Sequence, residues 1–189
     1  MKLHYIGKYN LDPDSLPHGE HKEGAVKFNE PDSTAELSRI VGKYSLFLLA
    51  VLVTLLLYKY RSLPTEDWLI GCLLCFVSLL PHELLHAVCF KGDAYLYTNL
   101  IQGMLFVVGP EDMSRGRFVF MSLLPNILFG LIPYVLALVL PDLGWLGIFG
   151  MLSLTAGVGD FYNVKNALTQ MPKNARCYLY KLNSYWYQP

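Results

Sequence analysis

Long apolar stretches are the feature that most constrains how this chain can fold. Residues 118–140 contain no charged side chain, and a helix needs roughly 20 predominantly apolar residues to cross a bilayer. Of the 189 residues, 53% are hydrophobic and only 16% are charged, which is typical of an integral membrane protein. We expect four membrane-spanning helices, at residues 44–58, 68–90, 118–140 and 143 to about 164.

The distribution of Lys and Arg predicts how these helices are oriented. Most of these cations lie in the two tails and in the loop 91–117, whereas the loop 59–67 and the turn at 141–142 hold few. Cytoplasmic loops carry the excess of Lys and Arg in membrane proteins. The prediction is therefore an all-α integral membrane protein with four transmembrane helices and both termini in the cytoplasm.

The remaining segments suggest three regions. Residues 1–40 are expected to form a polar, loop-rich cytoplasmic tail, with Ser33 or Thr34 capping the helix that follows. Residues 41–168 are expected to form the four-helix membrane domain, and residues 169–189 a cytoplasmic C-terminal tail. Two short β-prone runs between residues 94 and 108 predict a short β-hairpin at the cytoplasmic surface.

The second apolar stretch contains the pattern His-Glu-x-x-His at residues 82–86. Residues four apart share one helix face, so the imidazoles of His82 and His86 can bind one metal ion. Glu83 lies close enough to act as the general base that activates a zinc-bound water, which is the chemistry of peptide-bond hydrolysis. Unpaired ionisable groups are costly in a membrane helix, and a bound cation would compensate them.

A catalytic zinc site needs a third protein ligand and an open position for water. Asp160 is the leading candidate, because spans two and four run parallel and place it at a depth similar to that of His86. Cys89 is the alternative ligand, since it lies on the same helical stripe as the two histidines. Asn126 and Asn163 are candidates for orienting the ligands, and Asn126 could also bind substrate or hold helices together.

These residues resemble those of the site-2 protease group of intramembrane zinc metalloproteases, and more closely the bacterial membrane proteins called putative zincin peptidases. The resemblance rests on "HELLH" and on Asp160, and it covers roughly residues 68–165. It implies that His82, His86 and Asp160 bind zinc and that Glu83 is the base. This chain reads Val158-Gly159-Asp160-Phe161 where the group has Leu-Asp-Gly. The surface strands of that group, which bind extended substrates, resemble the predicted hairpin.

The sequence thus predicts a zinc-dependent intramembrane metallopeptidase that cleaves membrane or membrane-adjacent proteins near the cytoplasmic face. A multi-pass protein of the bacterial cytoplasmic membrane is expected, with the bilayer and a protein or peptide substrate as partners. The balanced charge gives no indication of nucleic-acid binding. Two alternatives remain open: a metal-ion or proton transporter, and a non-catalytic membrane protein with a structural zinc site.

Overall fold

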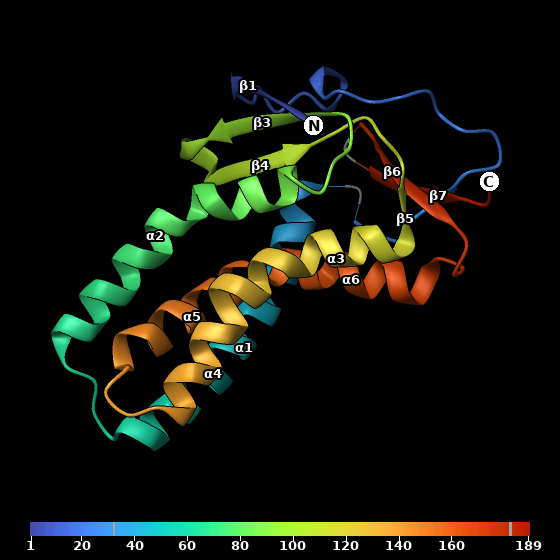
Figure 1. Ribbon diagram of the computed structural model, residues 1–189. Coiled ribbons are helices and arrows are strands. Elements are labelled where there is room, and N and C mark those ends of the chain that lie inside the picture. The colour runs from blue at the N-terminus through green and yellow to red at the C-terminus, as the bar shows by residue number, and fades with distance from the viewer. Residues whose placement is uncertain (32, 182) are drawn as a thin grey trace. The chain divides into compact units, whose positions relative to one another are not determined.

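The protein combines helices with small β-sheets (Figure 1). The computed structural model describes residues 1–31, 33–181 and 183–189. Over this part of the chain there are two compact units, and each is built from segments that are far apart in sequence. The helical unit comprises Ser33–His82 and Leu123–Tyr162. The sheet unit comprises Met1–Asp32, Glu83–Ser122 and Asn163–Pro189.

The helical unit is formed by apolar helices that pack around a small core. Ser33 caps the first helix by accepting a hydrogen bond from the Glu36 N–H, as the sequence predicts for Ser33 or Thr34. A π-helix, η3, joins two of the helices into one longer run. The core residues are Leu52, Leu56, Tyr134, Ile148, Met151 and Leu154. The elements are α1 (Thr34–Tyr60), α2 (Thr65–Ala87), α3 (Arg115–Pro125), η3 (Asn126–Leu131), α4 (Ile132–Val139), α5 (Gly144–Ala156) and α6 (Val158–Gln170), of which α2, α3 and α6 continue into the sheet unit.

Within the described residues, three helices are long and apolar enough to cross a membrane. They are Ala35–Tyr60, Thr65–Ala87 and the run Arg115–Val139. These helices correspond to the first three predicted spans. Their length and composition are compatible with a membrane protein.

The fourth predicted span is not continuous. The chain turns at Gly157, which separates α5 from α6. The 13 residues of α5 rise only about 20 Å, against a hydrocarbon core of about 30 Å. The more polar α6 begins at Val158 and carries Asp160 in its first turn, where the helix dipole favours a carboxylate. Four membrane-crossing helices are therefore not established.

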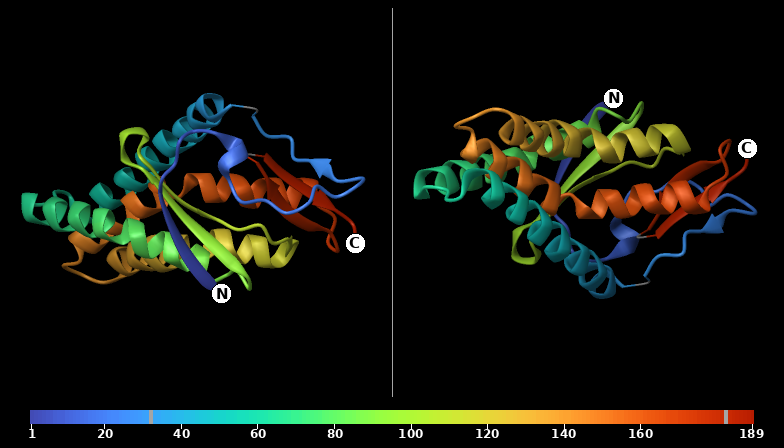
Figure 2. Two further views of the ribbon diagram at one scale, coloured as in Figure 1. Left: turned by 90° about the horizontal axis from the view of Figure 1, so that it is seen from above. Right: turned by 90° about the horizontal axis from the view of Figure 1, so that it is seen from below.

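The first sheet of the sheet unit has the order β1-β3-β4, and its strands lie side by side in Figure 2. Its strands are β1 (Lys2–Lys8), β3 (Asp93–Asn99) and β4 (Met104–Val108). Strands β3 and β4 form an antiparallel hairpin, which confirms the predicted hairpin between residues 94 and 108. Strand β1 adds to β3 in parallel, so β4 is an outer strand. Tyr9, Leu16 and Tyr97 form a small core on one face.

The second sheet has the order β2-β7-β6-β5. It is formed by β2 (Val26–Lys27), β5 (Met113–Ser114), β6 (Arg176–Tyr180) and β7 (Asn183–Tyr187). The prediction of an all-α fold was therefore wrong. Residues of both predicted tails find β-partners elsewhere in the chain, and sequence periodicity cannot reveal pairings over such distances. The expected division at residues 40 and 168 stays a prediction.

Hydrogen bonds that involve Glu111 and Arg117 hold the segment that follows α2. The Glu111 carboxylate accepts hydrogen bonds from the backbone N–H groups of Lys91 and Gly92, at 3.0 and 2.7 Å. Arg117 pairs with Glu111 and donates from Nε to the Cys89 carbonyl at 2.8 Å. These bonds satisfy backbone groups just beyond the helix end, so the direction in which the chain runs from α2 into β3 is fixed.

We expect Lys59→Met to destabilise the helical unit by about 2 kcal/mol, because ammonium hydrogen bonds are charge-assisted. Lys59 Nζ donates to the carbonyls of Ala137, Leu138 and Leu140 at 2.9, 2.8 and 2.6 Å, and so closes the end of α4. Methionine keeps the apolar stem and removes the donor. Thermal unfolding in detergent is the measurement. The control Arg61→Met removes a neighbouring cation that contacts the Tyr58 ring, and an equal loss in both variants would contradict the prediction.

We expect acid to weaken the sheet unit through Asp112. Burial alone would raise the pKa of this carboxyl, but hydrogen bonds from Tyr187 and Arg176 outweigh burial and lower the pKa below its ordinary value of 3.8. A lowered folded-state pKa stabilises the fold above the unfolded-state pKa, and that contribution is lost as pH falls below about 4.

The measurement is the midpoint temperature of thermal unfolding, recorded between pH 7 and pH 3. Asp112→Asn should lower the midpoint at pH 7 and flatten its fall in acid. If the variant keeps the wild-type acid dependence, Asp112 is not its source.

Candidate metal centre

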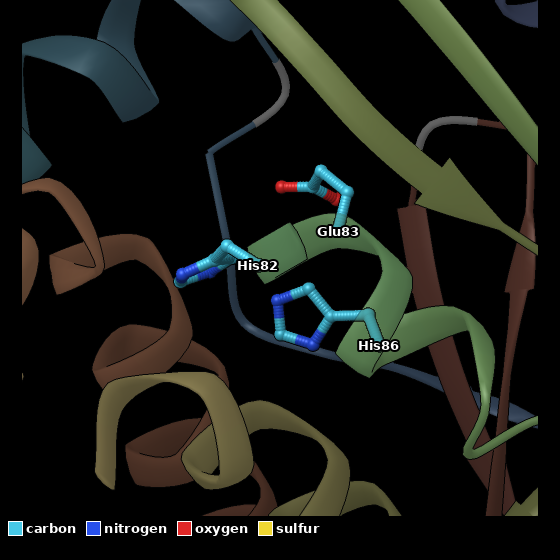
Figure 3. A group of neighbouring side chains, drawn as sticks. All are labelled: His82, Glu83 and His86. Carbon is cyan, nitrogen blue, oxygen red and sulfur yellow. The ribbon is translucent and has the colours of Figure 1, made fainter. Parts of the chain in front are cut away.

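The His-Glu-x-x-His residues lie on the last turns of α2. The ligand atoms of His82, Glu83 and His86 all lie within 4.8 Å of one another. Figure 3 shows the two imidazoles on one side of the helix and the Glu83 side chain on the same turn. Helical spacing of four residues brings the imidazoles together without help from other elements. His86 is buried, whereas His82 and Glu83 are half-buried.

A backbone carbonyl orients the ring of His86. Its Nδ1 lies 3.0 Å from the carbonyl oxygen of Met121 on α3. A carbonyl only accepts hydrogen bonds, so Nδ1 carries the proton and donates. The lone pair of the neutral ring is then on Nε2. This is the tautomer that a metal-binding histidine usually adopts.

Glu83 is held by the edge of the first sheet. The backbone N–H of Val107, on β4, donates to Glu83 Oε2 at 3.1 Å. The ladder of β4 pairs Val107 with Leu96 on β3, and β4 is the outer strand. The N–H of Val107 therefore points out of the sheet, toward the carboxylate. No sequence pattern predicts this contact, because every residue but proline carries the same backbone donor.

Asp160 lies next to His82 in the structure, whereas the sequence placed it at the depth of His86. His82 Nε2 and Asp160 Oδ2 are 3.2 Å apart, and both side chains are 16% exposed. Two ligands of one tetrahedral zinc ion, each about 2.0–2.1 Å from the metal, lie roughly 3.3 Å apart. The observed separation is that of a hydrogen bond between the two side chains, and it also lies close to the spacing of two side chains that share a metal ion.

Asn126 supports the carboxylate from the other side. Its Nδ2 donates to Asp160 Oδ2 at 2.7 Å, and the side chain is 1% exposed. Asn126 begins the π-helix η3, a wide helical turn of the kind that is frequent at functional sites. Gly157 leaves the space that Asn126 occupies, because a Cβ at this position would overlap the Asn126 amide. Neither the π-helix nor the close approach of Gly157 could be read from the sequence.

The other candidates have different surroundings. Asn163 follows Asp160 by one turn of α6 and is half-buried. Cys89 lies beyond the end of α2, and its thiol donates to the Leu85 carbonyl at 3.4 Å. In the part of the chain that the structure describes, the clustered metal donors are His82, Glu83 and His86, and neither Cys89 nor Asp160 belongs to this group.

The donor set is suited to zinc. Two imidazoles with one or two carboxylates form a borderline-soft ligand set that zinc accepts in catalytic sites, whereas calcium and magnesium prefer sites made of oxygen alone. Two features of the structure support binding of zinc: the tautomer of His86 and the short distance between His82 and Asp160. The residues present therefore fit a zinc ion.

Comparison with protein-family models found one match, to a family described as Putative zincin peptidase, over residues 75–176. The matched region includes the His-Glu-x-x-His motif, the β3–β4 hairpin and Asp160. Searches of curated proteins and of solved structures found no match.

Gly157→Ala should destabilise the protein by about 2 kcal/mol, because forcing a methyl group into packed surroundings costs roughly 1–3 kcal/mol. Its φ of −82° suits alanine, so the cost would come from contact with Asn126 and not from the backbone. Thermal unfolding measures the loss. The matched control is Gly159→Ala, where no atom lies within 4 Å of the added methyl. Equal stability of the two variants would show that the Asn126 contact does not constrain position 157.

Proposed function

The chain belongs to the Putative zincin peptidase family, whose model covers more than half of it, and on that premise we propose that it is an intramembrane zinc metallopeptidase. The observation that carries the proposal is the arrangement of donors: His82, Glu83 and His86 cluster on one turn of α2, and Asp160 approaches His82. The family supports the reaction class, peptide-bond hydrolysis with a metal. The three long apolar helices support the membrane setting.

In this proposal His82, His86 and Asp160 hold the zinc ion. A zinc ion held there would act as a Lewis acid, which lowers the pKa of water to about 7 and polarises a carbonyl. Met121 would keep His86 in the tautomer that binds metal, since its carbonyl takes the Nδ1 proton. Asn126 would hold the Asp160 carboxylate in place by its hydrogen bond to Oδ2. Asn163, one turn after Asp160 on α6, is a further candidate for this orienting role.

Glu83 is the proposed general base. Its carboxylate would take a proton from the attacking water and deliver that proton to the amine that leaves. The hydrogen bond from the Val107 N–H to Oε2 holds the Glu83 carboxylate in place. A carboxylate is suited to this task because it can accept and then return a proton within one reaction cycle.

The outer edge of β4 is the proposed place for the substrate backbone. An extended peptide can add to an exposed sheet edge by β-augmentation, with main-chain hydrogen bonds supplying affinity. The outward N–H of Val107 joins this edge to Glu83. A strand that adds beside Val107 would therefore bring its peptide bonds close to the base. Proteins that lie in or next to the membrane are the expected substrates, after local unwinding of their helices.

The proposed location is the bacterial cytoplasmic membrane, with the bilayer as the surrounding partner. The excess of Lys and Arg in the tails and in the loop 91–117 supports a site near the cytoplasmic face.

We expect one zinc ion per chain in the purified wild-type protein, measured by elemental analysis. His82→Ala and His86→Ala should lose the metal, and Asp160→Asn should weaken its binding, because each removes a ligand. His18→Ala and His21→Ala are matched controls that remove histidines of the N-terminal segment, and they should keep full zinc content. Metal-free wild-type protein, or full zinc content in His82→Ala, would contradict the proposed site.

The same preparations test the role of Glu83. Glu83→Gln should retain zinc and lose hydrolysis of a single-span model membrane protein by at least a hundredfold, because the base is missing while the ligands remain. Hydrolysis at the wild-type rate by this variant would eliminate Glu83 as the base.

A further inference from the structure

The tip of the β3–β4 hairpin exposes two adjacent aliphatic side chains. Leu100 is 85% exposed and Ile101 is 81% exposed, in the short 3-10 turn η2 (Leu100–Gln102). Outside the apolar helices, they are the most exposed large hydrophobic residues in the described chain. Scattered single apolar residues are ordinary on a surface, whereas a contiguous exposed pair at a projecting tip suggests a contact.

The tip is held in place from beneath. Asn99 is 4% exposed, and its Nδ2 donates to the Tyr9 carbonyl at 3.0 Å. Its side-chain oxygen caps η2 by accepting from the Gln102 N–H at 3.4 Å. Gly103 then closes the turn with a φ of +63°, a conformation that glycine adopts without strain. The exposure of Leu100 and Ile101 thus belongs to a built turn.

Chain connectivity ties the open end of the hairpin to two apolar helices. Residues 88–92 join α2 to β3, and residues 109–114 join β4 to α3. Both helices belong to runs that are long and apolar enough to cross a membrane. Segments this short reach about 20 Å at most. The hairpin is therefore tethered at both ends to helices that would end at the same membrane face.

The residues at the base of the tip are suited to contact lipid headgroups. An open cavity of about 360 Å³ lies there, and Lys8 is the charged residue among those described in its lining. Polar amides and a cation suit the phosphates and water of a bilayer interface, while aliphatic side chains suit the acyl region just below. The lining includes Lys8, Asn10, Leu11, Asn99, Ile101 and Gln102.

We propose that the β3–β4 tip inserts Leu100 and Ile101 into the bilayer interface and anchors the first sheet to the membrane surface. Two side chains cover only a small part of the roughly 800 Å² per partner that a standard protein interface buries, which argues against a second copy. A bilayer contact needs no such area, because the flanking helices already supply a high effective concentration. Since Val107 on the same hairpin contacts Glu83, the anchor would also hold the strand that contacts the proposed base.

The test uses the full chain in nanodiscs that each hold one copy, without substrate. A tryptophan is introduced by Ile101→Trp, and its emission is compared with the wild type in lipids brominated on the acyl chain close to the headgroup. The matched control is Val26→Trp on β2, where the native side chain is 47% exposed in the same unit. We expect the added emission at position 101 to be quenched at least twofold more than that at position 26.

Equal quenching at the two positions would overturn the proposal. If the emission at position 101 becomes protected from quenching only when several copies share a nanodisc, the tip would contact a second copy. That result would also overturn the proposal. Leu100→Trp serves as the reporter if Ile101→Trp does not fold. The readout is independent of zinc and of hydrolysis, so it stands or falls apart from the proposed peptidase activity.

Discussion

Ionisable side chains within an apolar helix are tolerated only where other groups compensate them, and the contact between His82 and Asp160 meets this constraint. The Asp160 carboxylate accepts from Asn126 and lies 3.2 Å from the His82 ring. Three separate segments thus converge on one carboxylate: α2, the π-helix η3 and the first turn of α6. The break at Gly157 serves the same end, since it starts a new helix close to Asp160 and leaves room for Asn126.

The sheet unit orients two residues of the motif, Glu83 and His86. Glu83 and His86 follow directly on His82, but their hydrogen-bond partners come from β4 and α3. The backbone groups of Val107 and Met121 direct a carboxylate and an imidazole that the helix alone would leave to rotate. The hydrogen bonds that Glu111 and Arg117 make to the backbone set the path from α2 to β3. One hairpin consequently links the proposed base, an outer strand and an exposed apolar tip.

Sequence reasoning anticipated the features that depend on local pattern. The His-Glu-x-x-His spacing, the three long apolar helices and the β3–β4 hairpin each follow from residues within one short segment. Asp160 was expected at the depth of His86, and the structure places it 3.2 Å from His82. The all-α expectation failed because β1 pairs with β3 across some ninety positions, and the second sheet joins residues near both termini. Such pairings have no period in the sequence that could reveal them.

The sequence by itself determined that two imidazoles and a carboxylate share one helical turn, because a period of 3.6 residues leaves little freedom over so short a span. It also determined that three helices are long and apolar enough to cross a membrane, because their composition excludes most charges. Only the tertiary structure decided which nitrogen of His86 is protonated, what holds Glu83, and where the last apolar stretch bends. Those features depend on backbone groups and on close packing at Gly157, and any residue can supply a backbone group in any sequence.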